Sequence, residues 1–290
     1  MNWLVVFTVF SSAILPSVFA DIDLTHCLAE GKDQRFPSKG YSRTVTANGT
    51  IEALGGIYLY NAEFFAPEHS GTHTDSPAHF QLGQHNIGEI PFDRLSGPGV
   101  VIDISQKAAD NPDVAVEVRD IKNWERRYGN IPKGAVVIMN SGYHKHYYDN
   151  KKYYGRPEGV PDTDIENMHY PGFSGAAMEY LITKRDIVGF AVDTISLDRA
   201  QDNNRFEAHR IAAAANVWGV ENIGHLDKLP PKGFLLYNMP LKLTDGSGAP
   251  SRVFAIMPGE TSSIRKTTRS VQHTGVCVCF NSTFGSIPQR

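Results

Sequence analysis

The chain has 290 residues, of which 41% are hydrophobic and 20% are charged. This composition is typical of a globular protein with a buried core, and it excludes a disordered or fibrous chain. The formal net charge is only −3, which excludes the broad basic surface that binds nucleic acid or anionic lipid. We therefore expect a small-molecule partner and no nucleic acid.

The N-terminal segment is apolar and uncharged. Residues 1–20 contain no Lys, Arg, Asp or Glu and end in the sequence Val-Phe-Ala. This pattern predicts a secretory signal peptide that is cleaved after Ala20. An uncleaved membrane anchor is the alternative, but the apolar run from Trp3 to Leu15 is shorter than the ~20 residues that a spanning helix needs. We expect a secreted, extracellular protein that has no membrane segment after cleavage.

Cysteines and glycosylation sequences agree with secretion. Cys27 lies near the start of the predicted mature chain, and Cys277 and Cys279 lie near its end. In an oxidising compartment, a disulfide from Cys27 to one of this pair would join the two ends. A metal site built on the Cys-x-Cys pair is the alternative. The triplets that begin at Asn48 and Asn281 match the N-glycosylation sequence, so we expect a glycoprotein.

Segments rich in β-branched and aromatic residues recur along the chain and predict short strands. The predicted strands span residues 56–65, 100–104, 135–139, 187–192, 234–237 and 253–257. Helices are predicted at residues 118–128, 174–183 and 205–217, with Ser174 as a candidate N-cap. Because strands and helices alternate, the predicted fold class is α/β. We expect one domain over residues 21–259, followed by a C-terminal extension over residues 260–290.

Four side chains that can bind metal lie close together, at His69, His73, Asp75 and His79. They are separated by even numbers of residues, so an extended segment would project all of them to one side. A helix would turn Asp75 away and would place Gly71 in its interior. Two imidazoles and a carboxylate form the mixed nitrogen and oxygen set that zinc, manganese or iron accepts. The alternative, histidines that are ordinary core residues, does not explain such a dense group.

Residues 69–80, HSGTHTDSPAHF, resemble the H-x-G-T-H-x-D-x-P-x-H signature of the cyclase family of metal-dependent hydrolases. This family includes bacterial kynurenine formamidases and isatin hydrolases. The resemblance continues, in order, through weaker blocks at residues 171–174, 189–198, 206–209, 220–223 and 240–252. It therefore extends over nearly the whole predicted mature chain, up to about Met257.

The resemblance implies the members of a metal site. His69, His73 and Asp75 match three ligands, and Asp75 would be able to bridge two ions. His209 and Glu221 match the remaining ligand positions. One continuous helix would point these two side chains in different directions, so we expect Glu221 on the strand or turn after the helix. The implied cofactor is a divalent metal, zinc or manganese, as one or two ions.

His79 matches the last histidine of the signature, which the family assigns to general acid/base catalysis. An imidazole with a pKa of about 6.5 can accept a proton from water and return it to a leaving amine. The implied reaction is hydrolysis of an amide-type C–N bond, in an aryl formamide such as N-formylkynurenine or a cyclic amide such as isatin. The alternative is a secreted, catalytically inactive member that binds a small aromatic ligand.

The resemblance also implies an architecture. Family members have a swivelling β/β/α domain in which helices surround a mixed, barrel-like sheet, and they form homodimers or larger homo-oligomers. The residues by themselves support only the α/β class.

Other polar and aromatic residues are given no place in the predicted metal site. A structural turn is expected to contain Asp193, Ser196 and Asp198, because Asp and Ser are turn formers. The alternative is that these side chains support the metal ligands from behind. Exposed loops are expected to carry most of five further histidines, His144, His146, His169, His225 and His273. Pocket walls or ordinary core are the alternatives for Phe64, Phe65, Phe80 and Phe92.

Overall fold

The structure is a computed structural model that describes residues 21–35, 39–157, 167–202 and 206–257. Its α-helices are α1 (Ser105–Asp110), α2 (Val118–Tyr128), α3 (Asn150–Tyr153), α4 (Gly175–Arg185) and α5 (Glu207–Ala214). Its strands are β1 (Ile22–Asp23), β2 (Ser42–Ile51), β3 (Ile57–Phe65), β4 (His73–Asp75), β5 (Ser96–Asp103), β6 (Ala115–Val116), β7 (Val136–Asn140), β8 (Gly172–Phe173), β9 (Gly189–Val192), β10 (Trp218–Glu221), β11 (Lys232–Pro240) and β12 (Gly248–Ile256).

Seven strands form a closed barrel in the order β12-β11-β5-β7-β9-β10-β4, and β4 closes it by pairing with β12. Strands β5, β7, β9 and β10 run parallel, whereas β11, β12 and β4 are antiparallel to their neighbours. The short strand β1 pairs with the far end of β12. The predicted fold class, a mixed barrel-like sheet with helices around it, is confirmed.

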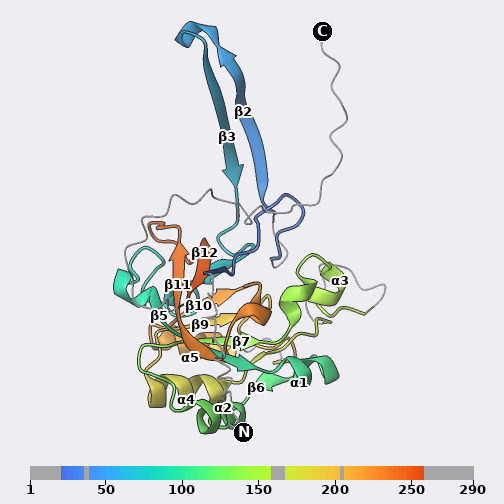
Figure 1. The fold of residues 1–290 in the computed structure, drawn as a ribbon, viewed down its shortest axis with the longest axis vertical. Helices are drawn as coiled ribbons and strands as arrows, with labels where there is room; N and C mark the ends of the chain where they lie inside the picture. Colours follow the sequence, from blue (N-terminus) through green and yellow to red (C-terminus); the bar gives the residue numbers. More distant parts are fainter. Residues whose placement is uncertain (1–20, 36–38, 158–166, 203–205, 258–290) are drawn as a thin grey trace, which may run out of the picture.

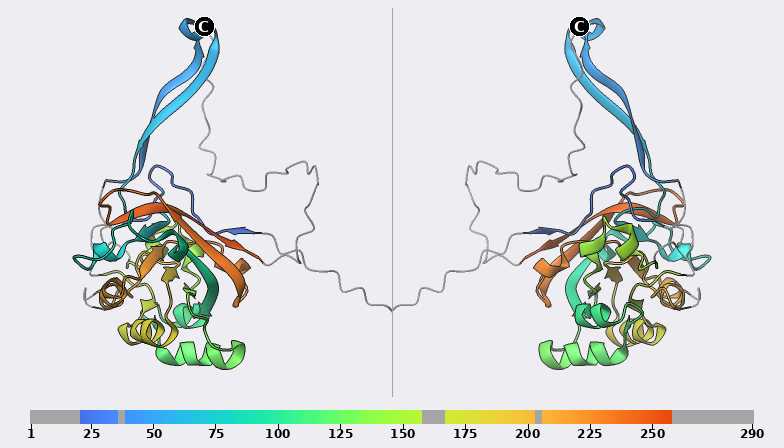
Figure 2. Two further views of the ribbon diagram at one scale, coloured as in Figure 1. Left: turned by 90° about the vertical axis from the view of Figure 1, so that its left-hand side faces the viewer. Right: turned by 90° about the vertical axis from the view of Figure 1, so that its right-hand side faces the viewer.

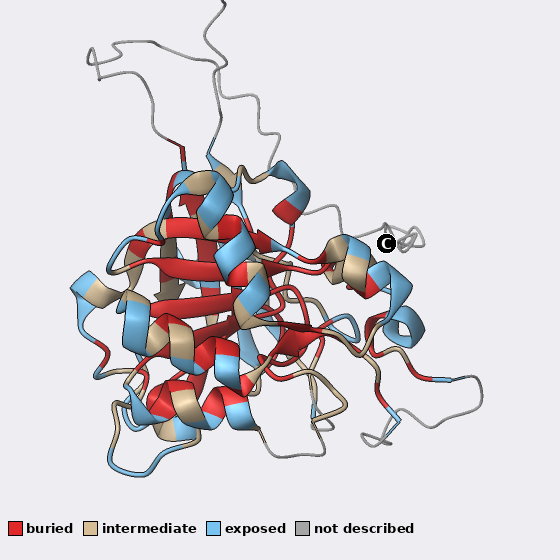
Figure 3. Ribbon diagram, turned by 90° about the horizontal axis from the view of Figure 1, so that it is seen from below, coloured by how far each residue is buried: buried red, intermediate tan, exposed pale blue. Residues whose placement is uncertain are grey.

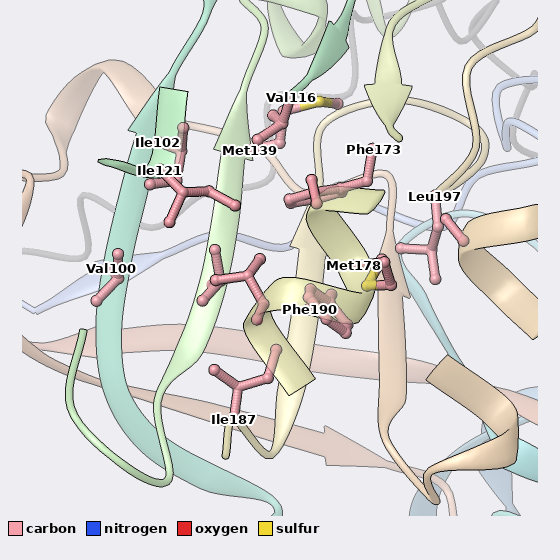
Figure 4. Close-up of a cluster of buried hydrophobic side chains, with 14 of the residues drawn as sticks. Val100, Ile102, Val116, Ile121, Met139, Phe173, Met178, Ile187, Phe190 and Leu197 are labelled. Atoms are coloured by element: carbon pink, nitrogen blue, oxygen red, sulfur yellow. The ribbon is translucent and has the colours of Figure 1, made fainter. Parts of the chain in front are cut away.

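The outer face of the parallel strands packs against helices α2 and α4, which lie together below the barrel in Figure 1. Val100 and Ile102 of β5 and Phe190 of β9 meet Ile121 of α2 and Met178 of α4 in one buried cluster (Figure 4). Seen from below, the central strands are mostly buried, whereas the helices combine buried, intermediate and exposed residues (Figure 3). These helices therefore shield the sheet on one side.

The inner face of the same strands fills a second cluster. Val101 of β5, Ile138 of β7 and Ala191 of β9 pack there with Trp218 of β10 and Val253 of β12. Because side chains alternate between the faces of a strand, consecutive residues of one strand enter different clusters. The nearly continuous apolar sequence of the parallel strands follows from burial on both faces.

The three predicted helices exist, and their ends have local causes. Helix α2 has the predicted bounds and begins with a capping box between Glu117 and Asp120. Helix α4 begins at the predicted N-cap, since the Ser174 side chain accepts a hydrogen bond from the backbone N–H of Ala177. Helix α5 ends at Ala214, three residues before the predicted end. Asn216, just beyond it, has a left-handed φ of +53°, which does not continue a helix.

A two-stranded arm projects from the barrel. It consists of β2 and β3, which pair along their length from Ser42↔Phe65 to Ile51↔Ile57. The arm stands clear of the barrel in all three side views (Figures 1 and 2). The sequence predicted β3 but not its partner β2. Several large apolar side chains of the arm are exposed, among them Tyr58 by 64% and Phe64 by 62%.

Several predictions concern residues at the chain ends. Two predicted segments lie outside the described residues: the signal peptide at residues 1–20 and the extension at residues 260–290. The second of these contains His273, Cys277, Cys279 and Asn281. Cys27 is disulfide-bonded, and Asn48 is exposed on β2. Within the described ranges, no helix is long and apolar enough to cross a lipid bilayer.

Candidate metal centre

The centre of the candidate site is β4, which lies between β10 and β12 where the barrel closes. His73 is paired with Glu221 in the β4–β10 ladder, and Asp75 follows two residues later. Side chains two residues apart on a strand share a face, so His73 and Asp75 point the same way as Glu221. Thr74 points into the barrel, where its hydroxyl bonds Asn238 and Ser251.

Helix α5 supplies His209, and Asp198 fixes the start of this helix. One oxygen of Asp198 accepts the backbone N–H of Ala208 (2.6 Å), and the other accepts that of His209 (3.2 Å). The second oxygen also accepts a hydrogen bond from Nδ1 of the His209 ring. Asp198 therefore caps α5 and orients the imidazole at the same time.

Two imidazoles and two carboxylates converge in the buried part of the site. Nε2 of His73 lies 3.3 Å from Oδ1 of Asp75 and 3.4 Å from Oε2 of Glu221. Nε2 of His209 lies 3.2 Å from Oδ2 of Asp75 and 3.2 Å from Oε1 of Glu221. All four residues are at most 5% exposed. Each carboxylate thus faces both imidazoles across a space that is shielded from solvent.

His69 and His79 form the more accessible side of the site. Nδ1 of His69 lies 2.7 Å from Oδ1 of Asp75. The rings of His69 and His79 are stacked, with centroids 4.0 Å apart. His69 is half-buried and His79 is exposed. Ligand atoms of His69, Asp75 and His79 are close enough to hold an ion, as are those of His73, Asp75 and Glu221, so Asp75 belongs to both groups.

The electrostatics of the site reflect opposite charges in a dry environment. Burial alone would lower the pKa of His73, but its hydrogen bonds with Asp75 and Glu221 raise it to about 10. The same balance, with Asp198 as the main partner, raises the pKa of His209 well above its usual value. Burial would raise the pKa of Asp75, but the attraction of His69 and hydrogen bonds with three histidines hold it well below its usual value.

These residues fit a divalent metal. Nδ1 of His73 donates to the carbonyl oxygen of Gly71 (2.9 Å), and Nδ1 of His209 donates to Asp198. In their neutral form, the rings would therefore direct their Nε2 lone pairs at Asp75 and Glu221. Lone pairs and carboxylates repel each other in a buried space unless protons or a cation lie between them. A nitrogen and oxygen donor set of this kind suits zinc or manganese.

Comparison with known proteins identifies the family. The family model Cyclase matches residues 22–199. The chain is 35% identical to isatin hydrolase of Roseibium aggregatum over 198 residues, which cover 66% of this chain and 72% of that protein. The chain belongs to the cyclase family of metal-dependent hydrolases.

Two further comparisons agree with this membership. Kynurenine formamidase of Paracidovorax citrulli is 24% identical over 196 residues, covering 66% of this chain and 76% of that protein. The solved structure of isatin hydrolase A from Ralstonia solanacearum superposes with a TM-score of 0.73 at 28% identity, over 82% of this chain and 92% of that chain.

In this cyclase-family chain, the signature segment follows a different path from the extended one that the sequence predicted. The segment from His69 to His79 is not one extended strand: only β4 is extended, Gly71 has a left-handed φ of +63°, and Pro77–His79 form a 3-10 helix. His69 and His79 reach the site because the chain turns at both ends of β4. The alternation rule therefore holds only for His73 and Asp75.

Two predictions about neighbouring residues were wrong. A structural turn was the preferred prediction for Asp198, over a position that supports the ligands from behind, yet Asp198 holds His209. His144 was expected in an exposed loop, yet it is buried and its Nδ1 lies 3.2 Å from Asp193. No sequence signal connected Asp198 with His209, because the contact depends on how the segment before α5 folds back.

Of the four phenylalanines considered as pocket walls, Phe80 lies at the site, with its ring 4.4 Å from that of His209. Phe64 and Phe65 lie on the arm, and Phe92 is 77% exposed. The sequence missed Phe206, whose ring lies 5.3 Å from that of Phe80.

We predict that metal binding displaces protons and strengthens with pH. Because the folded pKa of His73 is about 10 and its usual value is 6.5, the metal-free site holds that proton at neutral pH and must release it to bind an ion. Affinity should rise about tenfold per pH unit for each proton released. Titration calorimetry in buffers of different ionisation enthalpy would count the protons. An affinity that does not change between pH 6 and pH 9 would contradict the protonated site.

Proposed function

We propose that the protein is a metal-dependent hydrolase that cleaves an amide-type C–N bond. The observation that carries this proposal is the convergence of His73, His209, Asp75 and Glu221 in a buried space, with the accessible His79 beside it. The chain is similar to proteins named isatin hydrolase and kynurenine formamidase. Isatin is a cyclic amide, and a formamidase cleaves a formamide. An aryl formamide or a cyclic amide is the proposed substrate class.

Each residue has a role in this reaction. Zinc or manganese, as one or two ions, would be held by His69, His73, Asp75, His209 and Glu221. When bound, the metal would supply a Lewis acid for the substrate carbonyl and lower the pKa of water. Although His79 is accessible, part of its ring is shielded from water by the surrounding protein, which lowers its pKa below the usual value. His79 is therefore neutral at neutral pH and can accept the proton of the attacking water, then return it to the leaving amine.

Aromatic residues favour a flat substrate. The ring of Phe80 lies 4.5 Å from that of His79 and 4.4 Å from that of His209, and Phe206 adjoins it. Aromatic rings stack on aromatic ligands in offset or edge-to-face arrangements. We infer that the aryl ring of the substrate packs against Phe80 while its carbonyl is directed towards the ion that Asp75 would hold, beside His79.

We predict that His73→Ala and Glu221→Ala each reduce bound zinc and manganese by at least tenfold, because each removes a buried donor. Metal content after purification and dialysis measures this, with His169→Ala as the control, since His169 pairs with Asp113 instead. Unchanged metal content in both variants would contradict the site.

The wild-type protein should hydrolyse formyl-aryl amides or lactams in a panel that includes lactones. A catalytically inactive binding protein would instead bind aromatic compounds without converting any of them.

We predict that His79→Gln lowers kcat by about 10²–10⁴ and leaves metal content near that of the wild type. The reason is that the glutamine amide cannot accept the proton of water at neutral pH. Rates and metal content would be measured together, with His85→Gln as a control in the same segment. Loss of metal in His79→Gln would reassign His79 from proton transfer to ligation.

We also propose that the protein is secreted, glycosylated at Asn48 and assembled as a homodimer or larger homo-oligomer. The disulfide at Cys27 supports an oxidising compartment. The arm supports self-assembly. An isolated two-stranded hairpin is marginally stable in water, and this one exposes apolar side chains on both faces, such as Ile57 and Tyr58. The proposed partner of the arm is a second copy of the chain.

We predict that Tyr58→Ser combined with Phe64→Ser converts the assembly to monomers, because both side chains lie on the same face of β3 and are more than 60% exposed. Light scattering coupled to size-exclusion chromatography would give the mass. Leu82→Ser is the matched control, since Leu82 is 98% exposed outside the arm. A double variant with the wild-type mass would contradict the arm as the interface.

A further inference from the structure

Three imidazoles face Asp75 with one ring nitrogen, and each has a hydrogen-bond partner at its other ring nitrogen. These partners differ. His73 and His209 turn Nε2 towards the carboxylates and use Nδ1 for the carbonyl of Gly71 and for Asp198. His69 does the opposite: its Nδ1 faces Asp75, and its Nε2 lies 2.8 Å from Oγ of Ser247. Both ring nitrogens of His69 thus have partners, and turning the ring over would put carbon atoms in their places.

A serine hydroxyl can donate or accept, so Ser247 alone does not decide which nitrogen of His69 carries the proton. Glu68 decides it. One oxygen of its carboxylate accepts the hydroxyl of Ser247 (2.6 Å) and the backbone N–H groups of Ser247 (2.9 Å) and Gly248 (3.3 Å). Because a carboxylate only accepts, the Ser247 hydroxyl donates to Glu68 and offers a lone pair to His69. Nε2 of His69 therefore carries a proton. The proton that Nδ1 shares with Asp75 (2.7 Å) is then the one that a bound ion would replace, which leaves the Nδ1 lone pair for the metal.

We propose that Glu68 and Ser247 are positioning residues that fix the tautomer of His69, so that Nδ1 is the nitrogen that binds the metal. This inference rests on the proposed metal site and names two residues that act on it through His69. Hydrogen bonds to the second nitrogen of a metal-binding histidine orient the ring and commonly change metal affinity 10–100-fold when removed.

The backbone around Ser247 keeps this arrangement rigid. Its carbonyl oxygen accepts the backbone N–H of Ser76 (2.9 Å) and the hydroxyl of Ser76 (2.8 Å). A Cβ atom at Gly248 would lie 2.5 Å from Cε1 of His69, so the ring packs directly on the backbone there. Ser247 is consequently held in place by contacts that do not use its hydroxyl, and removing the hydroxyl tests the hydrogen bond and not the fold.

The experiment measures zinc affinity in the full chain for Glu68→Gln, Ser247→Ala, Ser247→Thr and the double variant Glu68→Gln/Ser247→Ala. A glutamine at position 68 can still accept the backbone N–H groups through its carbonyl. Its amide can also donate to the Ser247 hydroxyl and turn that proton towards Nε2 of His69. Glu68→Gln and Ser247→Ala should therefore bind zinc 10–100-fold more weakly, whereas Ser247→Thr, which keeps a hydroxyl, should bind like the wild type. Glu63→Gln on the exposed arm is the control.

Two readouts separate a tautomer effect from a merely structural one. We call the chain of hydrogen bonds from Glu68 through Ser247 to His69 the relay. Because Glu68 acts on His69 only through Ser247 in this relay, the double variant should bind zinc no more weakly than Ser247→Ala. Nitrogen NMR of the zinc-loaded, histidine-labelled protein should place the proton of His69 on Nε2 in the wild type. A wild-type proton on Nδ1, or zinc affinities within twofold of the wild type in both single variants, would overturn the relay alone. A wild-type protein that binds no zinc or manganese would overturn the proposed function, and the relay with it.

Discussion

The carboxylate of Asp75 is the point on which the site depends. Its Oδ1 faces His69 and His73, and its Oδ2 faces His209, all within 3.3 Å. A buried carboxylate is costly unless cationic or hydrogen-bonding partners surround it. Both cross-strand neighbours of Asp75 are glycines, Gly219 on β10 and Gly248 on β12. Gly248 leaves space for His69, since a Cβ atom there would lie 2.5 Å from Cε1 of the ring. The strand pairing that closes the barrel therefore also places Asp75 in the site.

Hydrogen bonds behind the ligands make the site rigid before any ion binds. Asp198 shows how fold and site share residues, since the same carboxylate begins helix α5 and directs the ring of His209. Asn222 acts in a similar way after β10: its side chain donates to the carbonyl oxygen of Gly71, which also accepts Nδ1 of His73. Side chains held this way lose little freedom on binding, which favours affinity and fixed geometry.

The sequence predicted the features that local periodicity controls. Helix α2 has the predicted bounds, and His73 and Asp75 share a face because a strand repeats every two residues. It could not show that β4 lies between β10 and β12, since pairing depends on contacts between distant segments. Ser247 lies 178 residues from His69, so no spacing rule connects them. Strand β2 escaped prediction because its sequence, SRTVTANGTI, is polar and contains glycine.

The site has a buried side and an accessible side. The buried side suits metal binding, and the accessible side suits proton transfer. His73, His209 and Glu221 are buried, which favours tight binding of a cation, whereas proton transfer requires a group that substrate and water can reach. His79 meets that requirement because it follows β4 in a 3-10 helix at the surface. The arm is connected to the site through the chain: β3 ends at Phe65, and Glu68 and His69 follow three and four residues later. A contact that fixes the arm in an assembly would thereby also fix the segment that carries His69 and its positioning carboxylate.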